Sequence, residues 1–247
     1  MHYDAAFELV RDNILDLSHV AFVHGQTLTS SDASATIAPK LERFPWGVRL
    51  TNWHPNEPLP PHYEGVSPFA GPIDRWFVAT AFAKGNVAMI EAGSSPAGRG
   101  LIVLETSVNE AGVGRHAPVD EAAAEQGSPE NTLRHAILHV LTPETKNSTH
   151  YFYNLRRRFA LEDETLTATL ADRFEVAFLE DKIMIEAQAK NIDPGSHMQV
   201  IRSDLALLHM RRLTRNLVQG EAEAAGSQSE RRQPNPEPVQ ADADSRM

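Results

Sequence analysis

The sequence feature that most constrains the fold is a long helical segment, residues 163–192 of a 247-residue chain. One face of this helix is predicted to pack against a core, and its members are Phe174, Ala177, Phe178, Ile185 and Gln188. At about 100° per residue, Asp181 falls in the middle of that face. An ionised carboxylate on a core-facing stripe is costly to bury unless it is paired or binds a metal.

Two explanations of Asp181 fit the pattern equally well. The first is a metal ligand, because no Lys or Arg lies one helical turn away to neutralise the charge. The second is an ion pair with an Arg from elsewhere in the chain, or a helix that is more exposed than its pattern suggests. The helix pattern alone leaves both open.

Short apolar or alternating runs, broken by Pro and Gly, precede this helix. They predict six strands, at residues 36–44, 48–53, 76–82, 100–108, 135–141 and 149–156. Pro45-Trp46-Gly47 is a turn that joins the first two into a hairpin. The segments 55–72 and 109–131 are predicted to be long surface loops, which in compact domains often form lids or pocket walls.

A second helix is expected at residues 202–219, with Gly220 as its stop. Residues 221–247 carry almost no large apolar side chain and are predicted to be a disordered acidic tail. The remainder, 1–220, is predicted to be one α+β domain, an antiparallel sheet with helices gathered at the C-terminal end.

Composition narrows the class of protein. A net charge of -10 argues against a nucleic-acid partner, which requires a basic face. Apolar runs are too short to span a membrane, and a basic-then-apolar signal segment is missing, so we expect a cytoplasmic protein without a membrane partner. The chain has no cysteine, which excludes disulfides and thiolate zinc sites.

The first helical segment, residues 4–24, carries two histidines near an acid. Asp16 and His19 share a face, whereas His24 lies about 140° further round and converges on His19 only at a bulge or a helix end. Gly25 supplies such an end. Two imidazoles and a distant carboxylate can form the facial triad of a non-haem iron(II) oxygenase. Taken alone, two unrelated histidines in a chain of eleven are the better explanation.

Four sequence blocks together carry a family resemblance. They are Asn13–His24, His139–Thr145, Ser148–Phe152, and Phe178–Lys182 with Glu186–Gln188. In this order they resemble the catalytic domain of the Rieske non-haem iron aromatic oxygenases, in the branch of vanillate and dicamba O-demethylase, over residues 4–218. The resemblance implies a helix-grip (START/Bet v 1-like) fold, in which a curved antiparallel sheet wraps a long C-terminal helix.

The resemblance also implies residue roles. His19, His24 and Asp181 match the iron ligands of the family. Asp16 matches an aspartate that hydrogen-bonds an iron-ligand histidine and a cluster histidine of the neighbouring subunit. Asn13 matches an asparagine close to the iron.

His139 resembles a histidine that lines the substrate pocket and binds a carboxylate or ether oxygen. His150 and Tyr153 are weaker pocket candidates, because strand residues often only pack or face solvent. The His135-x-x-x-His139 pair would suggest zinc on a helix, but no Glu follows His135 and the segment is predicted to be a strand, so we reject that interpretation.

The implied function is aryl O-demethylation with mononuclear Fe(II) and O₂, acting on a vanillate-like aromatic acid. Family members carry a Rieske [2Fe–2S] centre held by two Cys and two His, and they form trimers in which the cluster of one subunit serves the iron of the next. Without cysteine, this chain needs a cluster from another Rieske-bearing chain, with its reductase. A truncated gene, a misplaced start codon or a deliberate domain fragment explains the missing cluster at least as well. The alternative function is an inactive helix-grip domain that binds a small aromatic ligand, or a non-catalytic partner.

Overall fold

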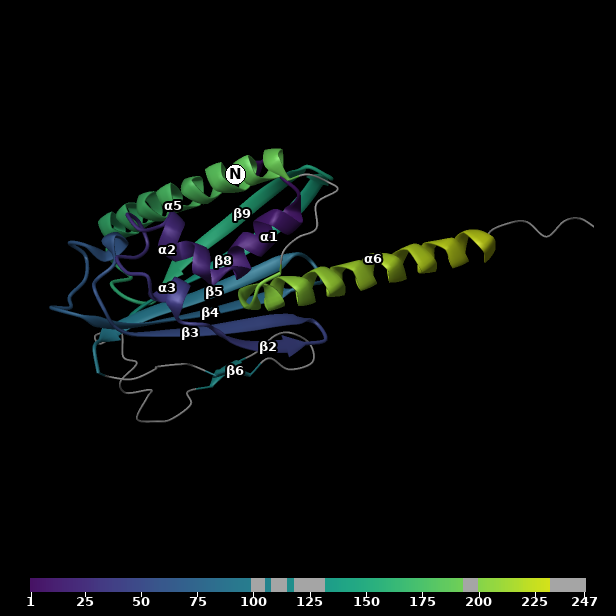
Figure 1. Cartoon of the computed structure of the whole chain (residues 1–247). Helices are drawn as coiled ribbons and strands as arrows, with labels where there is room; N and C mark the ends of the chain where they lie inside the picture. The colour runs from purple at the N-terminus through teal and green to yellow at the C-terminus, as the bar shows by residue number, and fades with distance from the viewer. Residues whose placement is uncertain (99–104, 108–114, 118–131, 193–199, 232–247) are drawn as a thin grey trace, which may run out of the picture.

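The computed structural model describes residues 1–98, 105–107, 115–117, 132–192 and 200–231 (Figure 1). Most of the predicted strand 100–108 and of the predicted loop 109–131 lies outside the described residues. Their described parts are two short strands that pair with each other, β6 (Glu105–Ser107) and β7 (Arg115–Ala117).

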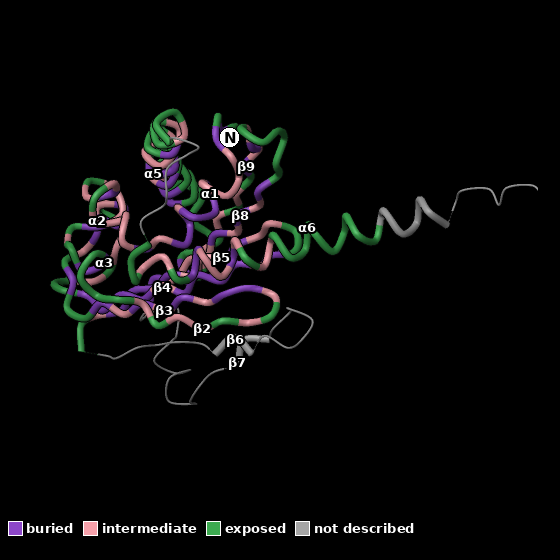
Figure 2. The backbone as a smooth tube through the Cα atoms, turned by 45° about the vertical axis from the view of Figure 1, so that its right-hand side comes forward, coloured by how far each residue is buried: buried purple, intermediate pink, exposed green. Residues whose placement is uncertain are grey.

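The main sheet has seven antiparallel strands in the order β1-β9-β8-β5-β4-β3-β2. Their bounds are β1 (His2–Tyr3), β2 (Lys40–Phe44), β3 (Gly47–Glu57), β4 (Ile73–Phe82), β5 (Val87–Pro96), β8 (Leu133–Thr145) and β9 (Ser148–Arg157). The predicted hairpin turn at residues 45–47 joins β2 to β3 and is confirmed. Burial is greatest along the central strands β3, β4 and β5 (Figure 2).

Strand β5 is central, yet the sequence did not predict it. Its Ala, Gly and Ser residues have weak strand propensity, so no strand pattern stands out. The small residues are explained by the neighbouring strand: a Cβ atom on Gly93 would lie 2.0 Å from Cζ2 of Trp76 on β4. Glycine has a low strand propensity, but it fits at this position because a side chain would collide with the Trp76 ring.

The longer helices are α1 (Phe7–Leu15), α5 (Glu164–Asn191) and α6 (Leu205–Arg231), and the short ones are η1 (Leu17–His19), α2 (Val20–Val23), α3 (Ala33–Thr36), η2 (Pro61–Tyr63) and η3 (Arg202–Asp204). Figure 1 shows α1 and α5 on the same side of the sheet, with α6 running out beyond it. The predicted α+β class, an antiparallel sheet with helices following it, is confirmed.

Helix α5 is capped by Asp163, whose carboxylate accepts a hydrogen bond from Leu166 N at 2.8 Å. Phe174, Ala177, Phe178 and Ile185 are buried as predicted. Gln188 was placed on this face wrongly and is exposed. The buried stripe instead continues from Ile185 to the partly buried Ala189, four residues on.

Two predicted helix boundaries are wrong. The segment 4–24 is not one helix: α1 ends at Leu15, and Asp16 separates it from η1 and α2. Gly220 does not stop α6, which continues to Arg231. The neighbouring Glu and Ala residues are strong helix formers, and one glycine costs only about 1 kcal/mol. Of the predicted tail, 221–247, the part from 232 onward lies outside the described residues.

Among the helices that the structure describes, none is long and apolar enough to cross a membrane.

Candidate metal centre

The break at Asp16 sets the position of His19. The Asp16 carboxylate accepts hydrogen bonds from Ser18 N at 3.0 Å and Ser18 Oγ at 2.5 Å, which starts a tight turn in place of further α-helix. Helix α2 then ends at Val23, and His24 follows directly. The five-residue spacing of the two histidines requires a helix end if they are to converge. That end is present, directly before His24.

The two histidines meet Asp181 of α5. The Nε2 atoms of His19 and His24 lie 3.2 Å apart. Oδ1 of Asp181 is 3.3 Å from Nε2 of His19 and 3.0 Å from Nε2 of His24. Three ligands about 2.1 Å from one metal ion are about 3.0 Å apart in octahedral and about 3.4 Å apart in tetrahedral coordination. The observed triangle lies within that range.

Contacts on the far side of each ring decide which nitrogen carries the proton. Nδ1 of His19 donates to the backbone carbonyl of Asp16, which can only accept. Nδ1 of His24 lies 2.8 Å from Oε2 of Glu180, and Thr27 Oγ1 donates to the same oxygen at 2.7 Å. With both protons on Nδ1, each Nε2 presents a lone pair toward Asp181, as metal-binding histidines do.

The charges of the site favour a cation. Burial raises the pKa of Asp181, but its interactions with the nearby His19 and His24 rings outweigh burial and bring the pKa well below its usual range. Burial lowers the pKa of His24, yet Asp181 and Glu180 together raise it above its usual value. The Asp181 and Glu180 carboxylates therefore favour a positive charge on His24 or beside it, as a proton or a metal ion.

The alternative explanation of Asp181, a distant Arg, finds no support. In the described part of the chain, the ion-pair partners of Asp181 are His19 and His24 alone. Its Oδ1 atom is buried and accepts no hydrogen bond of acceptable geometry, although both Nε2 atoms are close. Three acceptor atoms that face one another in this way could together hold a metal ion.

A mainly apolar cavity of about 90 Å³ adjoins these three side chains. The predicted residues Asn13 and His139 both line it, whereas Asp16, His150 and Tyr153 do not. His139 is buried on β8, and its Nδ1 lies 2.7 Å from Tyr151 Oη. Burial lowers the pKa of His139 to about 4, so the ring is neutral, and its Nε2 has no hydrogen-bond partner among the described residues.

The sequence did not predict Arg75, which also lines this cavity. Arg75 is 4% exposed and donates to the Leu28 carbonyl at 3.0 Å. Burial lowers its pKa to about 10, which leaves the guanidinium protonated at neutral pH. Within the described residues, no carboxylate lies within ion-pair distance of it. The sequence signal that could have identified Arg75 is the alternation along β4. Ile73, Arg75 and Phe77 lie on the same face of the strand, so an inward-facing position carries an arginine.

Two neutral histidines accompany Arg75. Nδ1 of His135 lies 2.7 Å from Tyr63 Oη, and burial lowers the pKa of His135 to about 3. His62 is buried with its pKa well below the usual value, again chiefly through burial. His135 and His139 both lie on strand β8, so the prediction of a strand there, and the rejection of a helical zinc motif, is confirmed.

Comparison with known proteins gives the family. Residues 3–220 match the vanillate O-demethylase oxygenase C-terminal domain. Over 226 residues the chain is 33% identical to the toluene-4-sulfonate monooxygenase system iron-sulfur subunit of Comamonas testosteroni, covering 90% of this chain and 58% of that protein. It is 28% identical over 233 residues to a vanillate O-demethylase oxygenase subunit of a Pseudomonas species, covering 90% of this chain and 62% of the relative.

Among solved structures, dicamba monooxygenase bound to 3,6-dichlorosalicylic acid has a TM-score of 0.70 at 22% identity, covering 90% of this chain and 58% of that one. This likeness confirms the expected helix-grip fold. The chain therefore belongs to the vanillate O-demethylase oxygenase C-terminal domain family, the catalytic part of Rieske-type oxygenases. It spans 58% to 62% of the length of the two relatives named above.

This family is one of non-haem iron oxygenases, and the residues present fit such a metal. Two imidazole Nε2 atoms and one buried, otherwise unpartnered carboxylate oxygen form an open set of three donors. That set leaves further coordination positions free.

Proposed function

We propose that this chain is the catalytic part of an oxygenase that acts on an aromatic acid, with mononuclear Fe(II) held by His19, His24 and Asp181. The observation that carries the proposal is the convergence of these three donor atoms beside a buried, mainly apolar cavity. When bound, the iron supplies the oxidising chemistry with O₂, and the protein supplies binding and orientation.

Arg75 supports an acidic substrate. A buried guanidinium without a carboxylate partner within the described residues is costly, and an anionic ligand removes that cost. The two ends of the cavity also differ in charge. Burial has the larger effect on both histidines and lowers the pKa of each; Arg75 lowers the pKa of His135 further, whereas Asp181 opposes burial and raises the pKa of His139.

The spacing along β8 gives the substrate a direction. His135 and His139 are four residues apart, about 13 Å along a strand. The acid group therefore binds near Arg75 and His135, and the methyl or methoxy group points toward the three donor atoms. The unpartnered Nε2 of His139 holds an ether oxygen or a ring substituent between these ends.

O-demethylation of a vanillate-like methoxy aromatic is the first reaction to test. Hydroxylation of the methyl carbon gives a hemiacetal, which collapses to a phenol and formaldehyde. The balance is one O₂, two electrons and two protons per ether, with one water released. The second candidate is hydroxylation of an aryl methyl group, which the 33% identity to the toluene-4-sulfonate monooxygenase subunit favours.

The two electrons require a separate centre. A Rieske [2Fe–2S] cluster needs cysteine, so it lies outside this sequence, and we propose that a Rieske-bearing chain with its reductase delivers electrons. The relatives are named as subunits of multi-component systems, which supports such a partner. Asp16 is the proposed entry point, because it is only half-buried and its carbonyl contacts His19. We further propose the family's trimeric assembly and a cytoplasmic location.

The test uses iron-loaded chain with hydrogen peroxide in place of O₂ and electrons. Formaldehyde release is measured from 4-methoxybenzoate and from the uncharged analogue 4-methoxytoluene. We expect product from the acid, a lower yield from the neutral analogue, and none from His19→Ala. Arg75→Met should remove the preference for the acid while iron stays bound.

Two results would overturn the proposal. Folded wild-type chain that binds no iron excludes the metal site. Iron-loaded chain that binds 4-methoxybenzoate and 4-methylbenzoate, but yields neither formaldehyde from the first nor a hydroxymethyl product from the second, supports the alternative, a helix-grip domain that only binds an aromatic ligand.

A further inference from the structure

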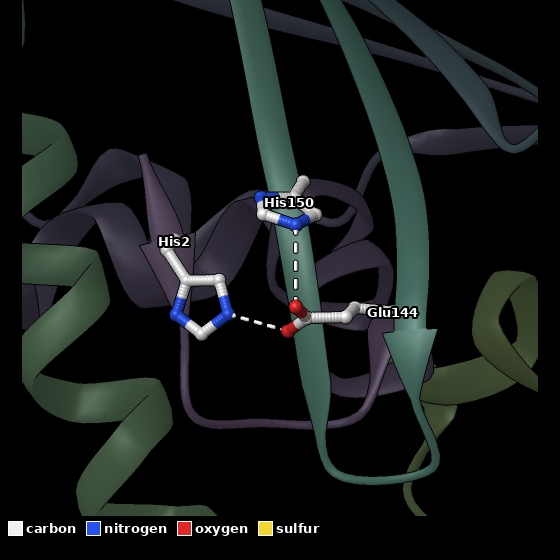
Figure 3. Close-up of side chains that lie close together, drawn as sticks. All are labelled: His2, Glu144 and His150. Atoms are coloured by element: carbon white, nitrogen blue, oxygen red, sulfur yellow. Dashed lines mark hydrogen bonds and ion pairs between the residues drawn. The ribbon is translucent and has the colours of Figure 1, made fainter.

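A second group of metal-ligating side chains lies on the surface, away from the cavity. It consists of His2 on β1, Glu144 on β8 and His150 on β9 (Figure 3). Nε2 of His2 is 2.8 Å from Oε2 of Glu144, and Nε2 of His150 is 3.6 Å from Oε1 of the same carboxylate. Figure 3 shows both rings turning a nitrogen toward this carboxylate.

The sheet register brings these residues together. His2 pairs directly with His150 across β1 and β9, and their ring centroids are 5.1 Å apart. His150 in turn pairs with Thr142 of β8, and Glu144 lies two residues further on, at the register shift between Pro143 and Thr145. Strand pairing thus places the two histidines side by side, and the irregularity at the end of β8 brings Glu144 to both of them.

Their chemistry suits a divalent cation of the zinc type. Two imidazole nitrogens and one carboxylate oxygen are a common zinc ligand set. One ligand atom from each residue lies within 4.8 Å of the others, so small rotations of side chains bring them to coordinating distance. The side chains are 44%, 45% and 45% exposed, so water can complete the coordination.

A further carboxylate lies beside this group. Oδ1 of Asp4 is 3.7 Å from Nδ1 of His2, within ion-pair distance although too long for a hydrogen bond. Its negative charge adds to that of Glu144 and favours a cation at this position.

We propose that His2, Glu144 and His150 bind a second divalent metal ion, of which Zn²⁺ is the best fit, and that this ion fastens β1 to the β8–β9 hairpin. Strand β1 is only two residues long, so one ion adds considerably to its attachment. The next residue, Tyr3, lines the catalytic cavity, so the site also steadies a wall of that cavity. Zinc is preferred to Fe(II) because nitrogen donors bind it more tightly in the usual metal series.

The experiment counts bound zinc by calorimetry on apo chain that carries no histidine tag. Wild type should bind two equivalents, one at each His-His-carboxylate group. Glu144→Gln should bind one equivalent, because it loses the charged ligand of the surface site. The zinc affinity of that site should fall by more than the roughly 10- to 100-fold that loss of an outer partner costs. The exposed Glu162→Gln is the matched control and should keep two.

A second measurement separates the two sites. In a His19→Ala background, zinc should still raise the melting temperature, and adding Glu144→Gln should remove that rise. Equal zinc counts in wild type and Glu144→Gln, or a single equivalent that His19→Ala removes, would overturn the proposal. Saturation only at millimolar zinc would overturn it too, since such binding is adventitious.

Discussion

Glu180 should control how tightly the metal is held, although it is not itself one of the three donors. Its Oε2 atom lies 2.8 Å from Nδ1 of His24, a ring that is 1% exposed. Changing Glu180 to Gln keeps an oxygen acceptor and the side-chain size but removes the negative charge. The imidazole then becomes a weaker donor to a cation at Nε2.

The size of the effect follows from these contacts. Loss of a partner behind a metal-binding histidine lowers metal affinity roughly 10- to 100-fold, or about 1.4 to 2.7 kcal/mol. Water cannot replace the carboxylate at a ring as buried as His24. However, the Glu180 side chain is 29% exposed, so solvent screens part of its charge. We therefore expect about a 30-fold loss in iron affinity for Glu180→Gln, and a larger loss for Glu180→Ala, which also removes the hydrogen bond.

The assay is competition for Fe(II) against a chromophoric chelator under anaerobic conditions, with circular dichroism to confirm the fold. Glu175→Gln is the matched control, because Glu175 is an exposed acid on the same helix. Thr27→Val should give a smaller loss, since it removes the hydroxyl that holds Glu180 at 2.7 Å. Wild-type iron affinity in both Glu180 variants would refute the reasoning.

Three further predictions concern stability. Because the pKa of His139 is lowered to about 4 from 6.5, its contribution is complete above pH 6.5 and is lost as pH falls toward 4, up to about 3 kcal/mol in urea unfolding; His139→Phe should remove this loss, and a variant that loses as much stability over that range as wild type is the contrary result. Gly93→Ala should cost about 3 kcal/mol by thermal melting, since its Cβ meets the Trp76 ring, and Trp76→Leu should relieve part of that loss. Arg211→Met should cost about 3 kcal/mol in urea unfolding, because Asp12 stays buried without its 2.7 Å partner, and Asp12→Asn should restore part of it.

The outline of the fold could be predicted from local pattern. Strand pairs β2–β3 and β8–β9 and helix α5 each carry a periodicity that reports which side of the element is buried. Strand β5 could not be predicted in this way, because Gly93 and the small residues around it are chosen by the Trp76 ring on the next strand. Similarly, the end of the first helix depends on the Asp16 carboxylate, which stabilises a turn where apolar spacing indicates continued helix.

For the candidate site, the sequence by itself determined the donor types and the face of α5 that carries Asp181, because helical periodicity relates neighbours within one element. The family resemblance implied that Asp181 joins His19 and His24, and the structure brings them together. Only the tertiary structure decided that Glu180 partners His24 and that Arg75 is buried in the same cavity. His24 and Glu180 are 156 residues apart, and contacts at that separation depend on how the sheet and α5 pack. No periodicity within one element encodes that packing.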